Sequence, residues 1–167
     1  MMDVRVMSIL RRTVDRQAVT MTLTQILALI AAVGSAVVGG IFFIFSTTII
    51  AALERQPVEQ TVAAMQAINR VILAPMFLGV FTGTALVGVA VVVTAPTEPL
   101  AWIGAALYVL GSFVLTRAYN VPLNDALDKA HGGGAEAWQA FRPRWMVGNH
   151  IRTVASIGGA VAFTLLV

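Results

Sequence analysis

Long uncharged stretches alternate with short polar connections along most of the chain. No charged residue occurs between Arg16 and Glu54, and none occurs between Arg70 and Glu98. A helix needs only about 20 predominantly apolar residues to cross a bilayer. Each of these stretches is therefore predicted to contain a membrane-spanning helix.

The same pattern predicts further spans along the rest of the chain. The predicted spans run from about Leu23 to Leu53, from Val71 to Val93, from Leu100 to Tyr119, and from Trp145 to the C-terminus. Short connections favour antiparallel packing of helices that follow one another in sequence. The expected fold is all-α: an integral membrane up-and-down four-helix bundle over residues 23–167. Residues 1–22 are expected to form a basic tail or an interfacial segment.

Prolines mark the connections between the predicted spans. Pro96 and Pro99 predict a tight turn between the second and third spans, because proline cannot continue a helix. Pro122 is predicted to interrupt the third helix, so that residues 120–127 form a short interfacial helix. A second short interfacial segment is expected from about Glu136, after a loop that contains His131.

Small residues predict where helices approach one another. Gly79 and Gly83 form a G-x-x-x-G pair inside the second span. Such pairs usually lie where two membrane helices are in close contact. The pair is therefore predicted to face another helix of the bundle.

Composition separates this chain from soluble proteins. Apolar residues make up 58% and charged residues 11%, which is far from the average of soluble domains. The absence of cysteine excludes disulfides, thiolate metal sites and a cysteine nucleophile. The net charge of +3 comes mostly from arginines around the spans, which is typical of membrane topology. Membrane lipid is an expected partner, and nucleic acid is not.

The basic residues near the N-terminus bear on orientation. Cytoplasmic segments next to membrane spans are enriched in Lys and Arg. Residues 1–17 contain Arg5, Arg11, Arg12 and Arg16. The tail therefore favours cytoplasmic termini, but seven basic residues on the opposite side of the predicted membrane favour the reverse, so both orientations stay open.

Polar side chains gather on one side of the predicted membrane. In an up-and-down bundle, the end of the first span lies beside the start of the second, the end of the third and the start of the fourth. That side contains Gln66, Asn69, Arg70, Arg117, Asn120, Asn124, Asn149, His150 and Arg152. Polar residues inside a membrane are costly and usually mark a functional site. A site is therefore predicted at this end of the bundle.

The start of the last span has two interpretations. Trp145, Asn149 and Arg152 share one helix face, and His150 lies about 100° away from Asn149. These side chains could form one wall of a reactive site. Alternatively, Asn149 and Arg152 tie the third and fourth helices together by hydrogen bonds or extend to the interface.

Several familiar cofactor sites lack their ligands in this sequence. A di-iron bundle needs repeated E-x-x-H pairs on facing helices, and copper or zinc sites need clustered His or Cys residues. Neither pattern occurs, so no metal site is predicted. A haem held by the single residue His150 stays open.

Two polar motifs resemble those of a known family. They are Asn120-x-Pro122-Leu123-Asn124 and Trp145-x-x-x-Asn149-His150-x-Arg152-Thr153, with Trp138 between them. From about Leu23 to the C-terminus the chain resembles the anthrone oxygenase family, a group of small four-helix integral membrane proteins. The resemblance implies a place in the bacterial cytoplasmic membrane. It also implies oxidation of anthrones to anthraquinones by molecular oxygen, without an established cofactor.

A site hypothesis follows from the resemblance and from the polar end of the bundle. The substrate is expected to be a hydrophobic, anthrone-like or quinol-like aromatic molecule, with no bound cofactor. His150 is expected to act as general base, while Arg152, Asn149 and Asn124 orient the substrate or stabilise its oxyanion. Trp145, Asn120, Arg117 and Asn69 are expected to bind the substrate.

A second hypothesis belongs to a different class of protein. The chain could be a small membrane carrier or an accessory subunit without catalytic activity. Its Asn and Arg motifs would then lock the third and fourth helices together and dock a partner. Assembly into a homo-oligomer is open under both hypotheses.

Overall fold

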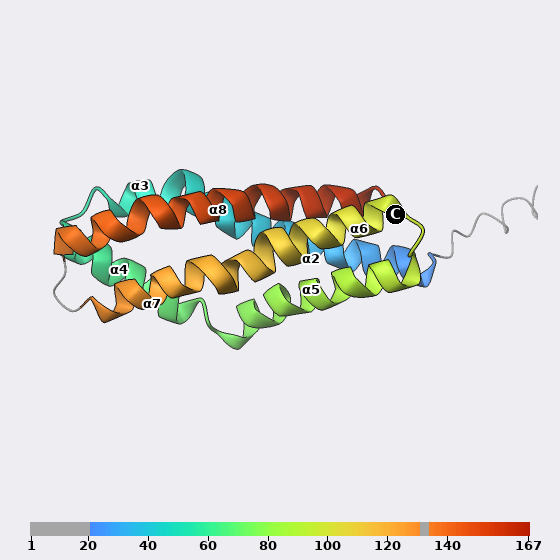
Figure 1. The fold of residues 1–167 in the computed structure, drawn as a ribbon, viewed down its shortest axis with the longest axis horizontal. Coiled ribbons are helices and arrows are strands. Elements are labelled where there is room, and N and C mark those ends of the chain that lie inside the picture. The colour runs from blue at the N-terminus through green and yellow to red at the C-terminus, as the bar shows by residue number, and fades with distance from the viewer. Residues whose placement is uncertain (1–20, 131–133) are drawn as a thin grey trace, which may run out of the picture.

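The structure is a computed structural model that describes residues 21–130 and 134–167. All regular secondary structure in these ranges is helical. The helices run along one long axis and form an elongated molecule (Figure 1). The predicted basic tail up to residue 20, and His131 of the predicted loop, lie outside the described residues.

The first predicted span is a single continuous helix. It consists of α2 (Leu23–Ile44), the π-helical turn η1 (Phe45–Ile49) and α3 (Ile50–Leu53). A capping box fixes its start, because Thr22 Oγ1 accepts a hydrogen bond from the Gln25 N–H and Gln25 Oε1 accepts one from the Thr22 N–H. The predicted bounds of this helix are confirmed.

The second predicted span begins later than expected. Helix α4 (Val58–Val71) ends before a short turn, and α5 (Pro75–Thr94) begins at Pro75. Proline suits the first turn of a helix, where its missing N–H is not needed, but it stops a helix that precedes it. The predicted start at Val71 is therefore wrong, and α4 is a separate amphipathic helix.

The third predicted span continues beyond Pro122. It is made of α6 (Pro99–Ala105), η2 (Ala106–Val114), η3 (Thr116–Asn120) and α7 (Val121–Lys129). In the π-helical turn η3, the Val121 N–H bonds to the Thr116 carbonyl, five residues back. This wider turn directly before Pro122 changes the hydrogen-bond register at the point where an α-helix would clash with the proline ring. The predicted interruption at Pro122 is wrong.

The last helix also begins earlier than predicted. Helix α8 (Gly134–Thr164) includes the segment from Glu136 and passes through Pro143 without a break. Together with α7, it shows that the two expected interfacial helices are extensions of long helices. The prediction of separate short helices between the third and fourth spans is therefore wrong.

Neighbouring segments pack side by side along the long axis. Helix α8 lies against α2, α6 and η2, and α5 lies against α2 and α6. The start of α2, the turn after α5 and the C-terminus meet at one end of the molecule (Figure 1). There Thr24 Oγ1 donates to the Thr94 carbonyl at 3.5 Å, and Gln25 Nε2 donates to the Val167 carbonyl at 3.0 Å. The other end contains α3, α4, α7 and the first turns of α8.

Three helices of the described residues are long and apolar enough to cross a membrane. They are Leu23–Leu53, Pro75–Thr94 and Pro99–Lys129. Helix α8 is not among them, because Asn149, His150 and Arg152 lie near its centre and lower its hydropathy. The chain is thus all-helical and consistent with an integral membrane protein.

Glycines allow close helix contacts, but not at the positions that were predicted. A Cβ added at Gly104 would lie 2.8 Å from Cε1 of Phe163, whose side chain is fully buried. A Cβ added at Gly79 or Gly83 would meet no atom within 4 Å. The predicted contact through Gly79 and Gly83 is therefore not made within the described chain, while Gly104 is in tight contact.

Substituting Gly104 tests this packing. Gly104→Ala is expected to lower the free energy of unfolding by about 1–3 kcal/mol, because the added methyl group overpacks the site against Phe163. Gly79→Ala is the matched control, and its melting temperature in detergent should equal or exceed that of the parent. Equal melting temperatures for the two variants would contradict this account of the packing.

Candidate functional site

A cavity of about 430 Å³ lies where the apolar helices meet the polar end of the molecule. Its walls come from α2, α4, α5, α7, α8 and the π-helical segments. Aromatic rings form much of the wall, and Phe81 is in the middle of them. The ring of Phe81 lies 5.6 Å from that of Phe77, 5.1 Å from that of Phe113 and 6.4 Å from that of Phe42. The cavity is therefore shaped mainly by packed aromatic side chains.

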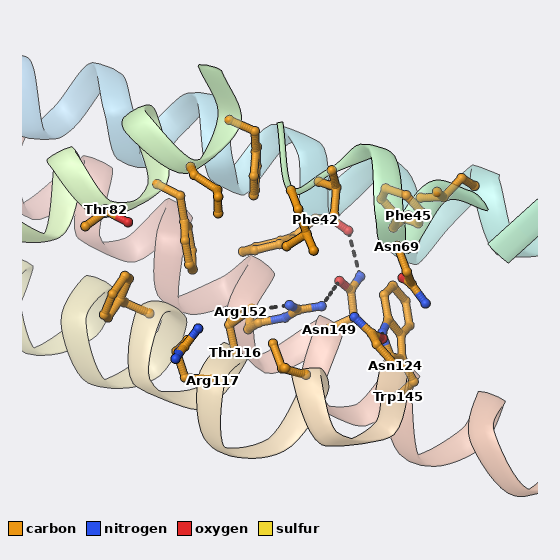
Figure 2. A pocket seen from close by; sticks show the side chains of 18 of the residues that line it. Phe42, Phe45, Asn69, Thr82, Thr116, Arg117, Asn124, Trp145, Asn149 and Arg152 are labelled. Atoms are coloured by element: carbon orange, nitrogen blue, oxygen red, sulfur yellow. Dashed lines mark hydrogen bonds between the residues drawn. The ribbon is translucent and has the colours of Figure 1, made fainter. Parts of the chain in front are cut away.

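A smaller group of polar side chains faces the same cavity (Figure 2). They are Asn69, Thr82, Thr116, Arg117, Asn124, Asn149 and Arg152. No Asp, Glu or His is among the residues that line it. The charged groups on its wall are therefore two guanidinium groups, with no carboxylate beside them.

Arg152 is buried without an acidic partner in the described chain. Its side chain is 4% exposed. Nη2 donates to Asn149 Oδ1 at 2.8 Å, and Nη1 donates to Thr116 Oγ1 at 3.2 Å. The guanidinium carbon lies 4.2 Å from the centre of the Phe42 ring and 5.4 Å from that of Trp145. Neutral dipoles and ring faces thus stabilise a charge that usually needs a counterion when buried.

Asn149 positions the guanidinium and joins α8 to α2. It is fully buried, and its Nδ2 donates to the Phe42 carbonyl and to Ser46 Oγ, each at 2.8 Å. Figure 2 shows Asn149 hydrogen-bonded both to the backbone at Phe42 and to Arg152. Ser46 belongs to η1 and Thr116 to η3, so two of the three π-helical segments in the described chain supply partners to this network. Such turns are frequent at functional sites.

His150 does not join the cavity. Its side chain is exposed, and the cavity lining does not include it. Its Nδ1 lies 3.0 Å from Ser46 Oγ, so its link to the buried network is indirect. The rotation of about 100° between successive helical residues places His150 on the outer surface when Asn149 faces inward. The geometry therefore does not support direct contact between His150 and a substrate in this cavity.

The other predicted site residues fall into two groups. Trp145, Asn124, Asn69 and Arg117 line the cavity with Asn149 and Arg152. The Trp145 indole Nε1 donates to Asn124 Oδ1 at 2.9 Å, which joins α8 to α7. Asn120 is fully buried outside the cavity lining, and its Nδ2 donates to the Trp145 carbonyl at 3.2 Å. Its visible contact is with the backbone of α8.

Two partners of the network were not predicted from the sequence. Ser46 and Thr116 are hydroxyl residues in apolar helices, and such side chains often bond only to their own helix. Thr116 does so too, because its Oγ1 donates to the Ser112 carbonyl at 2.7 Å while accepting from Arg152. A polar run, Ser46-Thr47-Thr48, in the middle of the first span was the available signal for Ser46.

No group of three or more His, Asp or Glu side chains in the described ranges could hold a metal ion. The cavity wall offers nitrogen donors and hydroxyl groups instead. Donors of this kind bind oxygen atoms that carry negative charge. The arrangement therefore suits an apolar molecule with an anionic oxygen.

The network predicts that substitutions at two neighbouring residues lower the free energy of unfolding by different amounts. Asn149→Ala is expected to lower the free energy of unfolding by about 1–3 kcal/mol, because Arg152 and the Phe42 carbonyl lose their partners in a buried place. His150→Ala should change it by less than about 0.5 kcal/mol, because this side chain is exposed. Equilibrium unfolding in detergent micelles measures both values. A His150 variant as unstable as the Asn149 variant would contradict the described network.

The chain was compared with known protein families. The family model described as anthrone oxygenase matches residues 11–162, which is nearly the whole chain. No curated protein and no solved structure matches it. The match covers the helices that build the cavity and the residues of its polar wall. The chain therefore belongs to the anthrone oxygenase family.

Proposed function

We propose that this protein oxidises a flat, apolar aromatic molecule of the anthrone or quinol type with molecular oxygen. The observation that carries the proposal is the guanidinium of Arg152, buried beside aromatic rings in a cavity without a carboxylate. The cavity volume of about 430 Å³ is in the range of small-molecule sites. Family membership supports the same class of reaction.

The proposal includes α8 as a fourth membrane span. Apart from His150, its exposed positions between residues 147 and 161 are apolar: Val147, Ile151, Val154, Ile157 and Val161. Its polar residues Asn149 and Arg152 are buried against other helices. Apolar side chains facing outward and polar side chains facing the interior are typical of membrane bundles. This pattern supports a four-helix transmembrane bundle.

The first chemical step is proton loss from the substrate. An anthrone has a methylene group opposite its carbonyl, and removal of one methylene proton gives an aromatic oxyanion. The oxyanion would lie against the guanidinium of Arg152, which Asn149 and Thr116 hold in place. A fixed positive charge in an apolar cavity stabilises this anion more than water would. The ionised form of the substrate therefore accumulates in the site.

The second step uses the anion as the reductant. The carbanion form of the substrate transfers electrons to molecular oxygen, and a carbon–oxygen bond forms at the former methylene carbon. The resulting peroxide anion takes up a proton in place of the one released, and the hydroperoxide so formed loses water as the second carbonyl forms. One oxygen atom enters the quinone and the other leaves as water. The substrate supplies all the electrons, so the balance requires no further reductant.

No step is assigned to His150 in this scheme. Arg117 is exposed on the cavity wall towards the polar end of the molecule, and the proposal takes a water molecule that enters there as the acceptor of the methylene proton. A haem iron within the cavity would also need a ligand other than His150, which lies on the outer surface. The visible absorption spectrum of the purified protein reports directly on a bound haem.

A second candidate function is supported by the hydrogen bonds of Asn149 and Arg152. They connect α8 with the first helix at Phe42 and Ser46, and with the third helix at Thr116. A network that only locks helices would suit a carrier or an accessory subunit. That function predicts binding of aromatic ligands without any substrate-dependent uptake of oxygen.

Substitution of Arg152 tests the enzymatic proposal. Arg152→Met keeps an unbranched apolar stem and removes the charged guanidinium, and it is expected to lower kcat/KM for anthrone-dependent oxygen uptake by about 100-fold to 1000-fold. Arg144→Met is the matched control, because Arg144 is exposed on the same helix and does not line the cavity. Its kcat/KM should equal that of the parent.

Oxygen uptake and a thermal melt are measured on the same samples. A folded Arg152→Met protein that keeps the parental kcat/KM would rule out the proposed role of the guanidinium. A parent protein that binds anthrones without consuming oxygen would favour the carrier function.

A further inference from the structure

We infer that the substrate carries a carboxylate on the same edge as the oxygen that becomes the oxyanion, and that Arg117 binds this carboxylate. The inference rests on the proposed function and adds the substrate class. It makes Arg117 a specificity-determining residue. Three observations carry it: the charge of the cavity, its unsatisfied donors and the place of Arg117.

The charge of the cavity exceeds what one oxyanion can balance. Arg117 and Arg152 both line it, and no acidic side chain does. A substrate oxyanion balances one of these positive charges. A second anionic group on the ligand would balance the other, so a doubly negative aromatic molecule leaves the occupied site neutral.

The polar atoms that lack partners on the cavity wall are donors. Asn69 Nδ2 and Arg152 Nε are buried and have no hydrogen-bond partner in the described structure. Both residues line the cavity. Buried donors without partners are costly, and a ligand that supplies acceptor oxygens removes that cost. A carboxylate adds two such oxygens to the one that the oxyanion provides.

The two guanidinium groups belong to the same side of the cavity. Arg152 donates to Thr116 Oγ1 at 3.2 Å, and Arg117 follows Thr116 in η3. Figure 2 shows the side chains of Thr116, Arg117 and Arg152 near one another. The rings of Phe77 and Phe81 come from α5. The site thus places both guanidinium groups on one edge and the aromatic rings of α5 on another, which matches a ring system with both anionic groups along one edge.

Arg117 also lies at a depth that suits a carboxylate. The third helix begins at Pro99, and 18 residue steps at the α-helical rise of about 1.5 Å place Arg117 at most roughly 27 Å further along it, since the wider π-helical turns shorten it. The hydrocarbon core of a bilayer is about 30 Å thick. Arg117 therefore lies near the edge of that core, where its exposed side chain can hold a carboxylate that keeps part of its hydration.

The test compares two ligands and several variants in maltoside micelles, which contain no phosphate that could occupy Arg117. The ligands are an unsubstituted anthrone and an anthrone with a carboxylate next to its carbonyl. Arg117→Met is expected to raise KM for the carboxylated anthrone about 10-fold, which is typical of losing one charged hydrogen-bonded pair. KM for the unsubstituted anthrone should rise much less, so that the ratio of the two KM values shifts against the carboxylated ligand.

Two further variants distinguish the effect of the positive charge at residue 117 from the effect of removing an arginine anywhere on the protein. Arg117→Lys restores a positive charge at the same place and should recover most of the affinity for the carboxylated ligand. Arg144→Met, outside the cavity, should not change the preference between the ligands. Equal effects of Arg117→Met on both ligands, or no effect on either, would overturn the inference.

A binding measurement separates this inference from the proposed function. The ligands for this measurement are anthraquinone and the anthraquinone with a carboxylate next to one carbonyl. Neither can be oxidised further in this reaction, and each can quench the fluorescence of Trp145 on the cavity wall. If the protein binds the carboxylated ligand more tightly, Arg117→Met removes that preference, and no anthrone is oxidised, the inference is retained and the proposed function is rejected. Oxidation of both anthrones without an Arg117-dependent preference would retain the function and reject the inference.

Discussion

Burial of an arginine without a carboxylate is the constraint on which this end of the molecule depends. Arg152 is 4% exposed, and its charge is met by Asn149, Thr116 and the ring of Phe42. These partners come from the first, third and last helices. The helices must therefore pack in one register, because a shift of any of them would leave the guanidinium in an apolar environment without partners. The site and the fold are held by the same contacts.

The outcomes at Pro75 and Pro122 show which parts of the fold the sequence could predict. The apolar stretches predicted where the long helices lie, since burial in a membrane requires such stretches. Pro75 ends one helix and starts another, whereas Pro122 lies within a continuous helix because a π-helical turn precedes it. The two prolines look alike in sequence. Their different outcomes depend on the backbone hydrogen-bond register, which tertiary packing sets and periodicity does not report.

The sequence predicted correctly those site residues whose position depends only on the direction in which each helix runs. Antiparallel spans place Asn69, Arg117, Asn124 and Arg152 at one end, and all of them line the cavity. The prediction was wrong where it depended on which side of a helix a single residue faces. His150 and Asn149 are adjacent in sequence, yet one is exposed and the other fully buried. Helical spacing gives the angle between them, and only packing against α2 decides which one faces inward.

The absence of a carboxylate beside Arg152 lowers the stability of the empty site and also allows the site to bind an anion. A buried Arg–Asp pair in this place would satisfy the guanidinium and cancel its charge. The site would then have no net field for a developing oxyanion. Here one amide, one hydroxyl and two ring faces hold Arg152 without cancelling its charge. The positive charge stays available to a ligand in the cavity, so the same arrangement that costs stability when empty is the one that favours an anion when occupied.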